Sequence, residues 1–148
     1  MNKSDLVHHL QALLQEKVNA SQLEIASTRS SFTSDTKSSA GDKHEVGRAM
    51  VQQELDKLEA QRAQLITLQE DLSRVPLERT FERVGFGSLV RTDQGVYFLA
   101  IGIGPVAIAD DTVFAISLRS PIGQLLQDKQ VGDTVHFNGR NLVIEHIR

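Results

Sequence analysis

The chain has 148 residues, 40% of them hydrophobic, which suffices for one average domain or two small domains with packed cores. Its formal net charge is −3, whereas a protein that binds free nucleic acid by itself normally carries a clear excess of lysine and arginine. We therefore expect a preformed protein complex as the partner. The absence of cysteine excludes disulfides, thiol catalysis and thiolate metal sites. No long apolar run or signal-peptide pattern is present, which predicts a soluble, cytoplasmic protein with no membrane partner.

Two amphipathic helices are predicted in the first half of the chain. The first extends from about Ser4, a candidate N-cap, to Thr28, and the second ends before Pro76. Only Arg62 interrupts the apolar stripe of the second helix. The stripes consist of Leu6, Leu10, Leu13, Leu14, Val18 and Ile25 in the first helix, and of Val51, Leu55, Leu58, Leu65, Leu68 and Leu72 in the second. Two such stripes joined by a loop predict an antiparallel coiled-coil hairpin over residues 1–75.

The segment that joins the helices, about residues 30–46, is rich in small hydroxyl residues and is predicted to be a loop; we call it the tip. It contains three carboxylates, those of Asp35, Asp42 and Glu45. Asp42, with Glu45 three residues later, is close to a capping box, so one interpretation of this pair is a helix start. Carboxylates that are not used as caps are suitable oxygen ligands for Mg²⁺. The sequence leaves both interpretations open.

After Pro76 the apolar pattern changes to period two, which predicts a small α+β domain over residues 77–148 with five or so strands and one short helix. Its last third carries clear local signals. Ser120 suits an N-cap and Pro121 the first helical position, and Asn138-Gly139 suits a two-residue hairpin turn with positive φ angles.

The order of these signals in residues 116–147 is strand, Ser-Pro-Ile, Leu-Leu, Val-Gly-Asp, strand, turn and strand. It resembles the C-terminal domain of the GreA/GreB family of bacterial transcript-cleavage factors. This resemblance implies an FKBP-like fold for residues 77–148 and bacterial RNA polymerase as the partner. It also implies that the tip enters the secondary channel of the polymerase and promotes cleavage of backtracked RNA. The chain would then be an accessory factor without a small-molecule substrate, and not an enzyme, because the hydrolysis belongs to the polymerase.

The family resemblance also suggests roles for residues of the tip. In the Gre family an acidic pair helps to hold a second Mg²⁺ in the active centre of the polymerase, so the factor needs no cofactor of its own. The corresponding candidates here are Asp42 and Glu45, with Asp35 as the third choice. The usual family pattern, an aspartate followed closely by Ser-Glu-Asn-Ala-Glu-Tyr, is not reproduced: the tip is acidic, but its spacing differs.

Basic residues accompany the carboxylates of the tip. Lys37, Lys43 and Arg48 are candidate contacts to the phosphates of the nascent RNA 3′ end, or else solvated charges beside a helix start. The altered tip leaves two alternative functions open. One is a polymerase-binding factor that occupies the channel, as a competitor or regulator, without cleavage. The other is a structural coiled-coil interaction protein unrelated to transcription.

An FKBP-like fold also raises the question of prolyl isomerisation, which needs an aromatic-lined pocket. Strand alternation predicts that most of the aromatic side chains lie in the core, so this activity is not expected. The aromatic residues of the C-terminal half are Phe81, Phe86, Tyr97, Phe98, Phe114 and Phe137.

Overall fold

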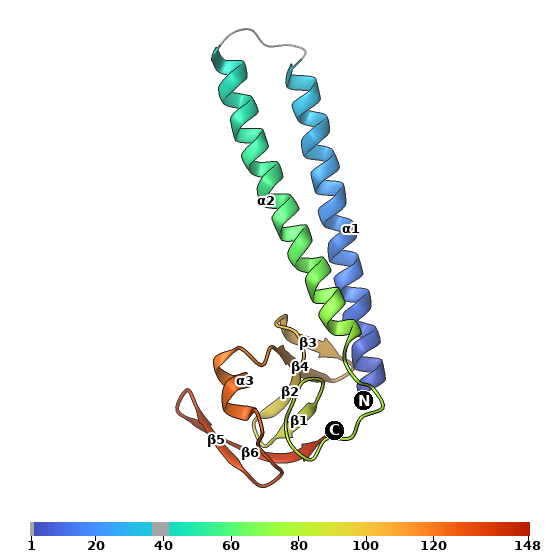
Figure 1. The fold of residues 1–148 in the computed structure, drawn as a ribbon, viewed down its shortest axis with the longest axis vertical. Coiled ribbons are helices and arrows are strands. Elements are labelled where there is room, and N and C mark those ends of the chain that lie inside the picture. The colour runs from blue at the N-terminus through green and yellow to red at the C-terminus, as the bar shows by residue number, and fades with distance from the viewer. Residues whose placement is uncertain (1, 37–41) are drawn as a thin grey trace. The chain divides into compact units, whose positions relative to one another are not determined.

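The computed structural model describes residues 2–36 and 42–148, and the side chains of residues 32–46 lie outside the described part. The helices are α1 (Lys3–Thr36), α2 (Asp42–Ser73) and α3 (Pro121–Leu126), and the strands are β1 (Leu89–Thr92), β2 (Gly95–Leu99), β3 (Gly104–Ile108), β4 (Asp111–Ile116), β5 (Thr134–Phe137) and β6 (Arg140–Ile147) (Figure 1). The chain packs as two units. The helical unit is Gln11–Glu70, and the globular unit combines Met1–Leu10 with Asp71–Arg148. The predicted α+β class, two long helices followed by a sheet with one short helix, is confirmed.

The N-terminus of α1 is capped by a residue that the sequence analysis missed. The side-chain oxygen of Asn2 accepts a hydrogen bond from the backbone N–H of Asp5 at 2.7 Å, which is N-cap geometry. The predicted cap, Ser4, lies inside the helix, and its Oγ is 3.5 Å from His8 Nδ1. The prediction for Ser4 is therefore wrong, because Asn2 precedes it and already satisfies a free N–H of the first turn.

Helix α1 continues to Thr36, so its backbone is helical over residues 30–36, where the sequence predicts a loop. Serine and threonine lower helix stability only by about 0.5 kcal/mol each, and extending a helix is easier than starting one. The hydroxyl of Thr28 shows how such residues are accommodated, since it donates to the carbonyl of Glu24 at 2.9 Å. Helix α2 begins at Asp42, so the backbone of residues 42–46, the end of the predicted loop, is helical as well, in agreement with the interpretation of Asp42 and Glu45 as a helix start.

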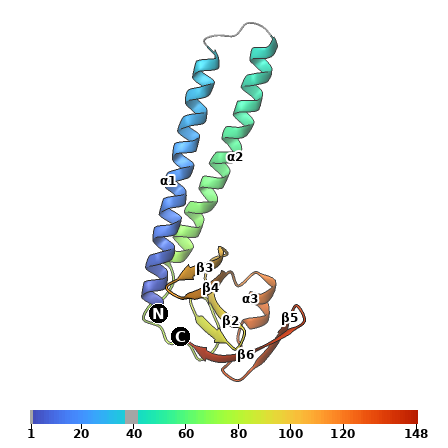
Figure 2. The same ribbon diagram turned by 180° about the vertical axis from the view of Figure 1, so that it is seen from behind.

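Within the helical unit α1 and α2 run side by side in opposite directions (Figures 1 and 2). The contacts between them establish this orientation. The side-chain amide of Gln69 donates to Gln15 at 3.1 Å, whereas Arg29, further along α1, pairs with Glu59, which comes earlier in α2. The antiparallel helical hairpin predicted from the two apolar stripes is therefore present.

The apolar seam of the hairpin is the stripe that the sequence predicts. In the helical unit the buried residues of the stripes are Leu14, Val18, Ile25, Leu55 and Leu58, and the half-buried residues are Leu13, Val51, Leu65 and Leu68; Leu6, Leu10 and Leu72 are buried in the globular unit. Ile25, Leu55 and Leu58 form one cluster, against which Val51 packs. Arg62, which interrupts the stripe, is half-buried and lines a hollow of about 430 Å³ together with Gln22.

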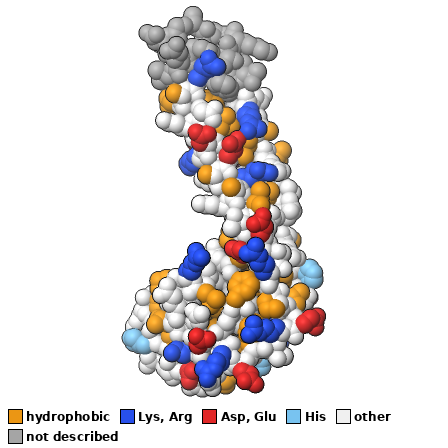
Figure 3. All heavy atoms as spheres, in the orientation of Figure 1, with side chains coloured by type: hydrophobic (Ala, Val, Ile, Leu, Met, Phe, Trp, Pro, Cys, Tyr) orange, Lys and Arg blue, Asp and Glu red, His pale blue; other side chains and the backbone are white. Residues whose placement is uncertain are grey.

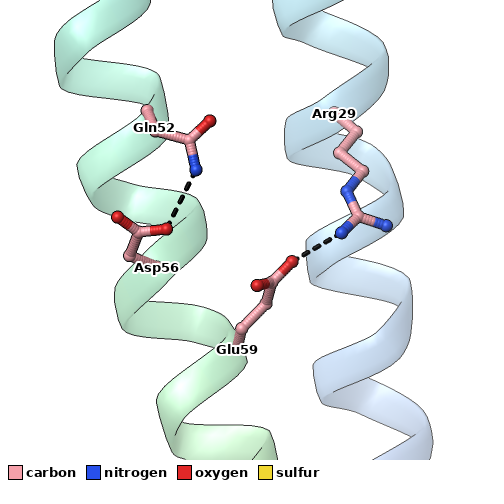
Figure 4. A network of polar contacts seen from close by, with 4 residues as sticks. All are labelled: Arg29, Gln52, Asp56 and Glu59. Carbon is pink, nitrogen blue, oxygen red and sulfur yellow. Dashed lines mark hydrogen bonds and ion pairs between the residues drawn. The ribbon is translucent and has the colours of Figure 1, made fainter.

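The polar contacts of the helical unit are more exposed than its seam. The Arg29–Glu59 ion pair joins the two helices, and Gln52 donates to Asp56 within α2 (Figure 4). The side chains of Arg29 and Glu59 are 62% and 48% exposed, so this pair contributes about 1 kcal/mol or less. On the face drawn in Figure 3, basic and acidic side chains both lie along the helices. The seam leucines must therefore provide most of the stability of this unit.

A carboxylate placed in the seam should unfold the helical unit. Leu58 is only 3% exposed, and we expect Leu58→Asp to lower the free energy of unfolding by about 3 kcal/mol or more, because the change removes a buried leucine and buries an unpaired charge. Leu23 in α1 is 73% exposed and provides a matched control, since Leu23→Asp should change stability by less than about 0.5 kcal/mol. Thermal melting followed by far-ultraviolet circular dichroism measures both. Equal melting of the two variants would contradict the role of the seam.

The globular unit contains one mixed six-stranded sheet in the order β3-β4-β2-β1-β6-β5. Strands β2 and β4 are parallel and all other neighbours are antiparallel. Helix α3 lies against the sheet (Figures 1 and 2) and buries Ile122 and Leu126. The core between them consists of Val84, Val90, Leu99, Ile122, Leu126, Val135, Leu142 and Ile144.

The local signals of residues 116–147 are confirmed. Ser120 has extended backbone angles and its side chain accepts a hydrogen bond from the N–H of Gly123, and Pro121 is the first residue of α3. Asn138 and Gly139 have φ angles of 49° and 76°, as a two-residue hairpin turn between β5 and β6 requires.

Candidate functional site

The turn before α3 is fixed by a compact set of hydrogen bonds. Ser120 Oγ donates to the carbonyl of Ser117 at 2.7 Å and accepts from the N–H of Gly123 at 3.1 Å. Gly123 is required here, because a Cβ atom would lie 2.1 Å from the carbonyl oxygen of Ser117. The backbone of residues 117–123 is thus held in one conformation at the edge of the core.

Beside this turn the globular unit has an apolar hollow of about 440 Å³, which we call the aromatic groove. It is lined by Tyr97, Phe114, Ile116, Ile122, Phe137, Asn138, Arg140 and Leu142. The rings of Tyr97 and Phe114 are stacked, with centroids 5.4 Å apart and planes inclined by 26°. A hollow of this size and apolar lining fits one or two apolar side chains of a partner.

The aromatic groove corrects the expectation that most aromatic side chains lie in the core. Phe81 and Phe98 are buried, but Tyr97, Phe114 and Phe137 are only half-buried. The parallel pairing of β2 and β4 sets Tyr97 directly beside Phe114, and the hairpin of β5 and β6 adds Phe137. Nothing in the local sequence reveals this convergence, because the three rings come from three different strands.

The aromatic groove has an uncharged lining, except for one positively charged side chain at its rim, that of Arg140. Burial raises the pKa of the Tyr97 hydroxyl, and the nearby Arg140 guanidinium opposes that rise. The phenol therefore stays protonated at neutral pH. Arg140 and Asn138 are exposed side chains of the lining, so the groove can take an apolar side chain with an acidic neighbour.

The candidate residues of the tip can be placed only along the chain. Asp35 belongs to the last turn of α1, Asp42 is the first residue of α2, and Lys43 and Glu45 follow it in the same helix. The side chains of these four residues, and the whole of Lys37, lie outside the described residues. Arg48 is described, and it is an exposed residue of α2. The roles of these residues in metal and RNA binding stay predictions.

Two further findings concern the described part of the chain. No group of three or more histidine or carboxylate side chains in it is arranged to hold a metal ion. None of its helices combines the length and the apolar character needed to cross a membrane.

No family model matches the sequence, and no curated protein matches it significantly. The solved structures similar to this chain include three that are described as Gfh1. GreA factor homolog 1 (Gfh1) of Thermus thermophilus is 19% identical, with 93% of this chain and 94% of that chain covered and a TM-score of 0.38. Gfh1 of Thermus aquaticus is 19% identical, with 92% of each chain covered and a TM-score of 0.34. A structure described as the transcription factor Gfh1 is 23% identical, with 93% of this chain and 92% of that chain covered and a TM-score of 0.35. All three TM-scores are below 0.5, so these similarities carry no argument about function.

Proposed function

We propose that this protein is a Gre-like accessory factor of bacterial RNA polymerase. In this proposal the globular unit docks on the polymerase, and the tip of the helical hairpin enters the secondary channel and promotes cleavage of backtracked RNA. The observation that carries the proposal is the Ser-Pro-Ile segment of residues 120–122, which resembles the family motif and belongs to a rigid turn beside the aromatic groove. The two long antiparallel helices, of 34 and 32 residues, suit the role proposed for the hairpin, which is to carry the tip into the channel.

The chemistry proposed for the tip requires oxygen ligands. Asp42 and Glu45, with Asp35 as the third candidate, are hard donors of the kind that Mg²⁺ prefers. A second Mg²⁺ in the polymerase active centre would activate water for attack on the RNA phosphodiester. The contribution of this chain would be to deliver carboxylate oxygens, while Lys37, Lys43 and Arg48 would contact RNA phosphates.

A second candidate function keeps the docking but not the cleavage. It is favoured by one observation, the tip sequence itself, in which the carboxylates are spaced differently from the family pattern and lysines stand beside them. A factor of this kind would compete for the channel. Cleavage of RNA in a stalled, backtracked polymerase complex, with and without the protein, separates the two functions. Failure of the protein to bind polymerase at all would favour the structural coiled-coil alternative.

If the globular unit docks on the polymerase through the aromatic groove, a change in the lining of the groove should weaken binding. We expect Phe114→Ser to weaken binding to the polymerase by about 30-fold, because a buried aromatic contact at an interface contributes about 2 kcal/mol or more. Val131→Ser is the control, since Val131 is 58% exposed and lies outside the groove. Fluorescence anisotropy of the labelled protein with purified polymerase measures both affinities. Unchanged affinity of Phe114→Ser, with the fold intact, would place the docking surface elsewhere.

A further inference from the structure

The opposite face of the sheet carries a second hollow of about 390 Å³, which we call the arginine hollow. Its lining is Leu89, Arg91, Val96, Glu145, His146 and Arg148. Val96 lines this hollow and Tyr97 lines the aromatic groove, and successive residues of a strand point to opposite faces. The two hollows are therefore independent surfaces of the globular unit.

Strand pairing brings the basic residues of the arginine hollow together. Arg91 of β1 is paired directly with His146 of β6, and on its other side with Val96 of β2. Arg148 exchanges two backbone hydrogen bonds of 2.9 Å with Leu89, which keeps it in the same ladder. The register shifts between Arg91 and Thr92, as in a β-bulge. Bulges of this kind redirect side chains and are common beside functional sites.

The basic side chains of the arginine hollow have no acidic partner in the described part of the chain. Neither arginine makes an ion pair there, and neither does His146, although Glu145 lines the same hollow. All three basic side chains are exposed. With His146 neutral, the two arginines and Glu145 give the lining a formal charge of +1, whereas the chain as a whole has a net charge of −3.

A neighbouring hollow of about 350 Å³ shares Arg148 and has one carboxylate in its lining, that of Glu78. Lys3 and Arg79 line it, and each lies 4.7 Å from the centre of the Phe81 ring. The Lys3 ammonium also donates to the carbonyl of Gly87 at 3.1 Å. Burial, and then the charge of Arg79, lowers the pKa of Lys3, so an anion here would relieve an unfavourable field.

We propose that the arginine hollow binds a phosphate group, carried by a nucleotide or by a nucleic-acid strand. Arg91, His146 and Arg148 provide planar nitrogen donors around one hollow, and a phosphate has enough oxygens and charge to engage all three. A single carboxylate has two oxygens and fits one arginine. The apolar side chains of Leu89 and Val96 give the ribose or base a surface to contact. The arginine hollow lies apart from the aromatic groove, and this proposal does not depend on the function proposed for the groove and the tip.

Titration of the full-length protein without polymerase tests the phosphate site. The probes are inorganic phosphate, a mononucleotide, a short single-stranded RNA and a polyglutamate peptide, followed by calorimetry or by amide chemical shifts of β1 and β6. We expect Arg91→Gln to weaken binding of the phosphate-bearing probes by about tenfold or more, and the double change with Arg148→Gln to abolish it. Arg119→Gln is the matched control, because Arg119 is exposed and lies outside the hollow.

The pattern of binding identifies the source of the phosphate. Binding of phosphate and mononucleotide, lost in the variants, supports a nucleotide ligand. Binding of RNA alone, lost in the variants and with a salt slope lower by about 1 for each arginine removed, supports a nucleic-acid strand. The proposal is overturned if no phosphate-bearing probe binds, if only polyglutamate binds, or if Arg91→Gln, with an unchanged melting temperature, binds like the Arg119→Gln control.

Discussion

Replacement of Gly123 by alanine should unfold the globular unit or nearly so. The added Cβ would lie 2.1 Å from the carbonyl oxygen of Ser117 and 2.9 Å from Ser120 Oγ. The Ser117 oxygen cannot move away easily, since it accepts hydrogen bonds from both the hydroxyl and the N–H of Ser120. Any relief would shift α3, whose Ile122 and Leu126 belong to the core. We expect a loss of about 3 kcal/mol or more in the free energy of unfolding, measured by urea denaturation.

Replacement of Gly47 by alanine should instead raise the free energy of unfolding. Gly47 lies within α2, and a Cβ there would meet no atom of the described residues within 4 Å. Alanine is a better helix former, so Gly47→Ala should stabilise the protein by up to about 1 kcal/mol.

A Gly123→Ala variant that unfolds at the same urea concentration as wild type would show that the turn before α3 is not rigid. Because Ile122 also lines the aromatic groove, the docking on polymerase that we propose for this groove should be lost in the same variant.

The elements predicted correctly are those whose signals are local. Ser120, Pro121 and the Asn138-Gly139 pair act through their own backbone and their nearest neighbours, so each can be recognised in isolation. The seam of the hairpin is equally local, since helical periodicity alone selects the face to be buried. The extension of α1 to Thr36 could not be predicted from composition, because serine and threonine are only weakly unfavourable in a helix that already exists.

Neither the aromatic groove nor the arginine hollow could be predicted from the sequence. The aromatic groove depends on the parallel pairing of β2 with β4, which lets strand residues far apart in the chain place Tyr97 beside Phe114. The arginine hollow depends on the pairing of β1 with β6, which joins Arg91 to His146. Strand order and register are set by the packing of the whole sheet, and no single segment encodes them. Periodicity assigns a side chain to a face of a strand but does not identify its neighbours.

Neutralising the two candidate carboxylates of the tip should separate cleavage from binding. We expect Asp42→Asn combined with Glu45→Gln to leave polymerase affinity nearly unchanged, because the aromatic groove is untouched. Mg²⁺-dependent cleavage should fall by orders of magnitude, since an amide keeps the shape of the side chain but loses the charge that holds the metal. Cleavage of labelled RNA in a backtracked complex gives the rate, and anisotropy gives the affinity.

Folding should not confound this comparison, because each amide keeps the shape of the side chain, and loss of a negative charge from the first turn of α2 costs about 1 kcal/mol or less. The single change Asp35→Asn tests the third candidate, and it should have the smaller effect if Asp42 and Glu45 are the pair that acts. Glu59→Gln is a control for charge, since Glu59 pairs with Arg29 in the described part of the hairpin.

Wild-type protein that binds the polymerase, blocks its channel and supports no cleavage at any Mg²⁺ concentration would establish the competitor function. The tip carboxylates would then be caps and surface charges, and the role carried over from the Gre family would be wrong.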